Sequence, residues 1–138
     1  MRQEGNETMY YFFPIAFVLG SFAIAFTLGK IFYEVKRRTG VQPLQVSDWL
    51  IIFSPFLLCF LCFVVAANFP GENDSHTANP TGVILCSGIR LIAYPLLIVT
   101  GVLYRRYPAM LFIVNLIQFV VFVLCSFHMG MAVTGDWL

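Results

Sequence analysis

The chain has 138 residues, a length typical of one domain, and 59% of them are hydrophobic while only 11% are charged. A soluble domain carries about 25% charged residues, and one this apolar would expose large aggregation-prone patches. The net charge of +1 excludes a general electrostatic attraction to nucleic acid. These values predict an all-α integral membrane protein.

Four apolar segments are long enough to cross a bilayer, because a helix needs about 20 residues to span the roughly 30 Å hydrocarbon core. In chain order they cover about 9–32, 49–69, 81–104 and 107–134. The second and the fourth contain no charged residue, and Arg90 interrupts the third. The sequence therefore predicts a single domain, a bundle of four transmembrane helices joined by short loops.

The charges between these segments are distributed unevenly. The loop after the first segment and the turn after the third carry the basic residues Lys30, Lys36, Arg37, Arg38, Arg105 and Arg106. Outside the spans, the opposite side has Arg2 alone as a basic residue. Basic loops stay in the cytoplasm, so we expect both termini and the loop 70–80 on the outer side.

Arg90 is the anomalous residue of the third segment. It precedes Arg105 by 15 residues, which places it about 22 Å above the cytoplasmic end of its helix, in the outer half of the membrane. An arginine at such depth costs about 2.5–3.5 kcal/mol to insert. No acidic residue lies inside any predicted span, so the chain supplies no counter-ion there.

Other polar residues are predicted near Arg90. Tyr94 follows it by one helical turn, and Asn115 and Gln118 share a face of the fourth segment, which the short turn places antiparallel to the third. Arg90 could approach the level of Gln118 by reaching inward, toward the cytoplasmic end of its helix. It is then either a structural arginine bonded to amides and carbonyls, or part of a site for an anion, a lipid headgroup or a partner's carboxylate. The candidate binding residues are Arg90, Tyr94, Asn115 and Gln118.

Small residues recur every four positions in two segments. The first has Ser21, Ala25 and Gly29, and the fourth has Ser126, Gly130 and Thr134. Such rows let helix backbones approach closely in lipid. We expect one row to serve packing within the chain and the other to serve contacts in an oligomer.

Two patterns suggest redox or metal chemistry. Cys59 and Cys62 form a C-x-x-C, but the pair lies mid-span among Phe and Leu, where a thiolate is strongly disfavoured. The predicted topology is also the reverse of that in quinone-linked disulfide enzymes. His128 and His76 are candidate haem or metal ligands, yet only His128 lies in a span. The cysteines are better interpreted as packing residues, and no metal or cofactor is predicted.

The sequence contains no nucleotide-binding loop, acid–base pair or nucleophile–base pattern, so an enzyme is not expected. The leading hypothesis is a non-catalytic accessory or scaffold subunit of a membrane complex, oligomeric, with the basic loop 30–48 facing a cytoplasmic protein or anionic lipid. One alternative is an oligomeric conduit, sensor or small effector with a polar path around Arg90, Asn115 and Gln118. Another is a thiol redox protein using Cys59 and Cys62.

The source membrane is suggested by the loops. Asn6 and Asn73 each begin an N-x-[ST] pattern on the predicted outer side, which matters only in a eukaryotic host. Short loops favour a bacterial inner membrane. The expected partners are the bilayer, other membrane subunits and copies of the chain itself, and no nucleic acid.

Overall fold

The computed structural model of the chain describes residues 4–72 and 77–135, and describes side chains within them from residue 14 onward. The described part is all-helical, as predicted, apart from one isolated bridge between Glu72 and Thr77. Its five helices are α1 (Glu4–Arg37), α2 (Val46–Phe53), α3 (Pro55–Asn68), α4 (Pro80–Leu103) and α5 (Pro108–Thr134).

Three of these helices are long and apolar enough to cross a membrane. They are the part of α1 from Pro14 onward, α4 and α5, with mean hydropathies of 2.0, 2.0 and 2.5. The pair α2 and α3 passes the same test when its two halves are joined. The described residues thus contain three helices of spanning length, or four if the bent pair is one span.

The predicted segment 49–69 is a broken helix, where the sequence predicted one continuous span. α2 and α3 are bent by 43° at Ser54. Pro55 causes the break because it has no N–H to donate to the carbonyl of Ile51. The Ser54 hydroxyl and amide bond that carbonyl instead, at 2.7 Å and 3.2 Å.

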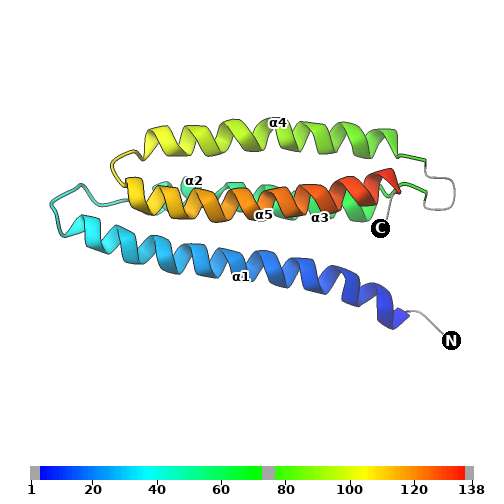
Figure 1. The fold of residues 1–138 in the computed structure, drawn as a ribbon, viewed down its shortest axis with the longest axis horizontal. Helices are drawn as coiled ribbons and strands as arrows, with labels where there is room; N and C mark the ends of the chain where they lie inside the picture. The colour runs from blue at the N-terminus through cyan, green and yellow to red at the C-terminus, as the bar shows by residue number, and fades with distance from the viewer. Residues whose placement is uncertain (1–3, 73–76, 136–138) are drawn as a thin grey trace.

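Helix α5 lies at the centre of the packing. It contacts α1, α3 and α4 along its length, and α3 also packs against α4 (Figure 1). In the apolar window of α5, 44% of the residues are buried, against 17% for α1 and 22% for α4. The outer surfaces of α1 and α4 are therefore apolar and exposed, as expected for helices that face lipid.

Both rows of small residues are used inside the chain. Ala25 is fully buried, and a Cβ added to Gly29 would lie 3.1 Å from the Val114 side chain of α5. Ser126 is buried as well, and a Cβ on Gly130 would lie 3.2 Å from Nη2 of Arg90. The expectation that one row would be left for oligomer contacts is therefore wrong for these described residues, because helix rotation turns both rows toward neighbouring helices.

The connection between α3 and α4 is fastened to the end of α5. The amides of Gly71 and Asn79 donate to the carbonyls of Ala132 and Val133, each at 2.9 Å. The last carbonyls of a helix have no partner within the helix, so the connection satisfies two of them. A Cβ at Gly71 would lie 2.6 Å from the Val133 oxygen, and glycine at this position lets the backbones touch.

The loops lie at two opposite ends of the molecule. The α1–α2 loop and the α4–α5 turn lie at one end, and the α3–α4 connection lies at the other, beside the last turn of α5 (Figure 1). The first of these ends thus holds the basic residues Lys30, Lys36, Arg37, Arg38, Arg105 and Arg106, and we call it the basic end.

Candidate functional site

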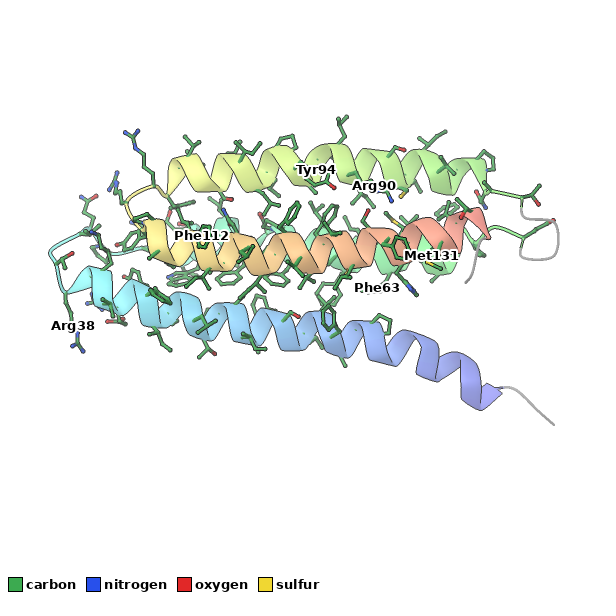
Figure 2. All side chains as sticks on the ribbon, viewed as in Figure 1. Arg38, Phe63, Arg90, Tyr94, Phe112 and Met131 are labelled. Atoms are coloured by element: carbon green, nitrogen blue, oxygen red, sulfur yellow. The ribbon has the colours of Figure 1, made fainter. Side chains whose placement is uncertain are left out.

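Arg90 connects α4 to α5 through a single residue. Its Nε donates to the Ser126 hydroxyl at 2.6 Å, and its Nη2 donates to the Ser126 carbonyl at 3.1 Å. The guanidinium lies between the two helices (Figure 2). The Arg90 side chain is nevertheless exposed on the surface of α4, so this arginine is held by α5 without being enclosed.

The approach of Arg90 toward Gln118 that the sequence suggested is not found. Side chains on a helix lean toward the helix N-terminus, and the N-terminus of α4 lies at the end away from the basic end. Arg90 therefore reaches Ser126, and Gln118 lies more than two helical turns away from Ser126 along α5. The small residues Ser126 and Gly130 were the sequence signal for this contact. Ser126 supplies the two acceptors, and Gly130, which has no side chain, leaves room for the guanidinium.

The charge of Arg90 has no carboxylate partner in the described residues. Their one ion pair joins Arg37 to Glu34 at 3.6 Å. The Nη1 group of Arg90 forms no hydrogen bond within the same part of the chain. A guanidinium has five N–H donors, so Ser126 leaves donors available for a group from outside the chain.

Tyr94 packs as an aromatic side chain. Its ring centroid lies 5.9 Å from that of Phe122 and 6.4 Å from that of Phe119, both on α5. The ring is 42% exposed. Tyr94 thus continues the α4–α5 contact from Arg90 toward the basic end.

Gln118 forms a hydrogen bond next to the break between α2 and α3. It is 1% exposed, and its Nε2 donates to the Ile52 carbonyl at 2.8 Å. Its Oε1 is buried with no hydrogen-bond partner in the described part of the chain. Gln118 therefore joins α5 to the last turn of α2 and does not join Arg90.

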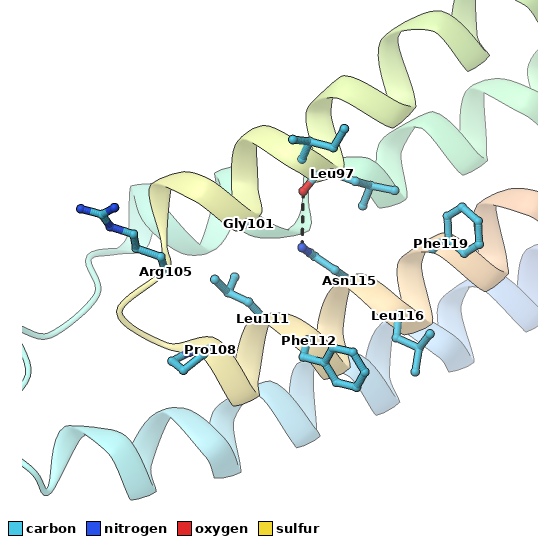
Figure 3. A pocket seen from close by; sticks show the side chains of 10 residues that line it. Leu97, Gly101, Arg105, Pro108, Leu111, Phe112, Asn115, Leu116 and Phe119 are labelled. Atoms are coloured by element: carbon cyan, nitrogen blue, oxygen red, sulfur yellow. Dashed lines mark hydrogen bonds between the residues drawn. The ribbon is translucent and has the colours of Figure 1, made fainter.

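Asn115 faces a crevice between α4 and α5. Its Nδ2 donates weakly to the Leu97 carbonyl at 3.4 Å, and its Oδ1 has no partner among the described residues. The crevice has a volume of about 500 Å³. We call it the α4–α5 crevice; it is shown in Figure 3 and is lined by Leu97, Ile98, Gly101, Arg105, Pro108, Leu111, Phe112, Asn115, Leu116 and Phe119.

The three polar groups predicted to form one path lie in three environments. Arg90 bonds Ser126, Gln118 bonds Ile52, and Asn115 bonds Leu97. Within one chain they do not contact one another through these bonds. The geometry of the single chain therefore gives no support to the conduit hypothesis.

A polar cluster closes the basic end. The Tyr104 hydroxyl donates to Oδ1 of Asp48 at 3.1 Å, and Oδ2 of the same carboxylate accepts the Gln45 amide at 2.7 Å. Burial raises the pKa of Tyr104, in the turn after α4, and the hydrogen bond to Asp48 raises it further. Arg106 donates to the Gln42 side chain at 3.0 Å, and the Tyr107 hydroxyl donates to the Gln42 carbonyl. The α1–α2 loop is thereby fixed to the α4–α5 turn.

The six predicted basic residues have different surroundings. Arg106 bonds Gln42, Arg37 pairs with Glu34, and the Lys30 ammonium lies 5.8 Å and 5.7 Å from the rings of Phe26 and Trp49. The side chains of the remaining three form no hydrogen bond, ion pair or ring contact with the described residues: Lys36, Arg38 and Arg105. Arg105 is the one of these that lines the α4–α5 crevice.

The cysteines and histidines form no metal cluster in the described part of the chain. Cys59 and Cys62 are 1% and 0% exposed, and both are free thiols. His128 is half-buried with its ring 5.9 Å from that of Phe63.

Several predicted features fall where little or nothing is described. Asn6 lies in α1, where side chains are not described, and Asn73 and His76 lie outside the described residues.

Comparison of the chain with models of known families, with curated proteins and with solved structures finds no match.

Proposed function

We propose that the chain is a multi-pass membrane protein that works as a non-catalytic accessory or scaffold subunit of a membrane complex. Its four spans are α1, the bent pair of α2 and α3, α4 and α5. The basic end faces the cytoplasm, in keeping with the distribution of lysine and arginine, and both termini face the outer side. The exposed apolar surfaces of α1 and α4 support a lipid environment.

The observation that carries the proposal is the incomplete bonding of Arg90. It lies ten residues, or about 15 Å, from the outer end of α4, which is within the hydrocarbon of the outer leaflet. Ser126 supplies a hydroxyl and a carbonyl but no negative charge. An acidic side chain on a partner's transmembrane helix would neutralise the guanidinium at that depth, as charged residues inside membranes commonly pair with one another.

The surface of α4 beside Arg90 is suited to a neighbouring helix. Ile84, Ser87, Gly88 and Leu91 share one face by their spacing, and a Cβ added at Gly88 would meet no other heavy atom within 4 Å. Ile84 and Leu91 are 71% and 76% exposed. Small residues flanked by large apolar ones allow the close approach that favours helix association in lipid.

The test is recovery of membrane partners with the tagged full-length chain in mild detergent. Arg90→Gln should insert normally but lose those partners that the wild type retains, whereas Arg90→Lys should keep part of them because the charge remains. Arg38→Gln, which removes an exposed basic charge at the other end, is the matched control. Unchanged partner recovery for Arg90→Gln would show that Arg90 is structural or bonds lipid phosphate.

Charge exchange identifies the contact directly. Arg90→Glu should abolish recovery of a partner that carries the pairing carboxylate. Replacement of that carboxylate by arginine in the partner should then restore it. Failure of every acidic position in the partner's spans to rescue Arg90→Glu would refute the ion pair.

A further inference from the structure

The α4–α5 crevice combines apolar walls with one free cation at its mouth. It lies toward the basic end, where α4 and α5 approach their connecting turn (Figure 3). Arg105 stands at that turn and extends past the end of α4. Its side chain forms no hydrogen bond or ion pair with the described residues, in contrast to that of its neighbour Arg106, which the Gln42 side chain holds.

The depth of the crevice matches one membrane leaflet. Its lining runs from Pro108 to Phe119 on α5, a distance of about 17 Å along the helix axis. A half-bilayer of hydrocarbon is about 15 Å thick. An apolar ligand that enters at the headgroup level beside Arg105 would therefore reach the middle of the membrane beside Phe119.

We propose that the α4–α5 crevice binds an anionic phospholipid of the cytoplasmic leaflet, with an acyl chain between the helices and the phosphate on Arg105. The proposal rests on the membrane location proposed above, and it is independent of the partner proposed for Arg90. The cytoplasmic leaflet carries anionic lipid, and basic pockets between spans on that side bind such headgroups. The charge of Arg105 thus matches the phosphate of this ligand, and the apolar walls of the crevice match its acyl chain.

A second copy of the chain fits the crevice less well. A two-fold contact between parallel copies pairs each surface with itself. It would bring the Arg105 side chains of both copies to the same depth beside one another. Like charges there repel, whereas a phosphate between the walls is attracted. Charge therefore favours the lipid as the occupant.

The headgroup contact is tested by competition between two lipids. Purified full-length chain in mild detergent is incubated with equal amounts of phosphatidylglycerol and phosphatidylcholine of identical acyl chains, and bound lipid is counted by native mass spectrometry. The wild type should prefer phosphatidylglycerol, and Arg105→Gln should lower that preference about fivefold. Arg38→Gln removes an equally exposed charge and should not. An equal loss in both variants would assign the preference to general surface charge and overturn the proposal.

The acyl-chain contact is tested by filling the crevice. Gly101 lies on its wall, and a Cβ there would be 3.7 Å from Nδ2 of Asn115. Gly101→Leu should remove both lipids from the site, while Gly20→Leu on α1, where a Cβ also meets open space, should leave binding unchanged. Leu116→Trp narrows the crevice from α5 and serves if Gly101→Leu does not fold.

Two further readouts separate the outcomes. Lipid retained by a folded Gly101→Leu or Leu116→Trp variant would overturn the crevice as the binding site. Recovery of the wild-type chain outside the membrane fraction would instead contradict the membrane location on which both proposals rest. A chain that stays in the membrane but binds the two lipids equally would overturn the crevice proposal alone.

Discussion

The side-chain amide of Gln118 on α5 lies 2.8 Å from the carbonyl oxygen of Ile52, in the last turn before the helix break at Ser54. This bond places a polar residue deep in the bundle for a structural reason. The break caused by Pro55 disturbs the regular pattern of helix hydrogen bonds, and a carbonyl in hydrocarbon needs a donor. Gln118 supplies that donor from another helix.

Gln118→Leu should therefore destabilise the protein by about 1–3 kcal/mol, because it leaves the Ile52 carbonyl buried without its partner. In a Pro55→Ala background the loss should be smaller, since a straighter helix lets the Phe56 amide reach that carbonyl. The coupling between the two substitutions is measured by thermal unfolding, in detergent, of the wild type, the two single variants and the double variant. Equal losses in both backgrounds would show that the bond and the break are independent.

Gly71 should tolerate no side chain. A Cβ there would lie 2.6 Å from the Val133 oxygen and 2.7 Å from the Gly135 nitrogen, and both are backbone atoms that cannot turn aside. Gly71→Ala should cost about 1–3 kcal/mol by overpacking, measured as a lower melting temperature in detergent. Gly20→Ala, at a helical position with nothing within 4 Å, is the control and should not destabilise.

The stability of the basic end should fall at high pH. The pKa of Tyr104 is raised above its usual value by burial and by Asp48, so the folded state holds the hydroxyl proton more tightly than the unfolded state does. Stability from this group is complete below the unfolded pKa of about 10 and is lost as pH rises through the folded pKa. Melting temperatures between pH 8 and 11 should fall more steeply for the wild type than for Tyr104→Phe. Parallel curves would contradict this assignment.

The proposed orientation predicts opposite locations for two reporters. A reporter fused after Leu138 should be active on the outer side, and one inserted at Thr39, in the basic α1–α2 loop, should be active in the cytoplasm. A cytoplasmic C-terminal reporter would mean that the number of spans or their direction is wrong.

Sequence reasoning was most successful where length and composition decide the structure. The helical segments followed from uncharged apolar runs, because few other arrangements satisfy the backbone in lipid. The break was missed although Pro55 stood within the predicted span, and the proline rule alone would have located it. Helix α2 also begins earlier than the predicted segment, at Val46, where the Asp48 carboxylate caps the Gln45 amide.

The candidate site was predicted less well, for a geometric reason. The polar residues were identified, but pairing them required the rotation of each helix about its axis, which apolar runs exposed on several faces do not specify. The lean of side chains toward the helix N-terminus did specify that Arg90 points away from the basic end. The Gln118–Ile52 bond joins residues 66 positions apart and depends on a bend that had not been predicted.

The central position of α5 has a consequence for biosynthesis. Ribosomes deliver a chain from its N-terminus, so α5, which contacts α1, α3 and α4, is made after all three of them. Until then, Gly71, Asn79 and Ile52 lack the groups on α5 that they bond in the finished protein. Before α5 is made, α1, α3 and α4 lack the contacts that they form with it in the folded structure. A chain that stops before Pro108 therefore lacks these partners, and its Ile52 carbonyl is left without the donor that Gln118 supplies.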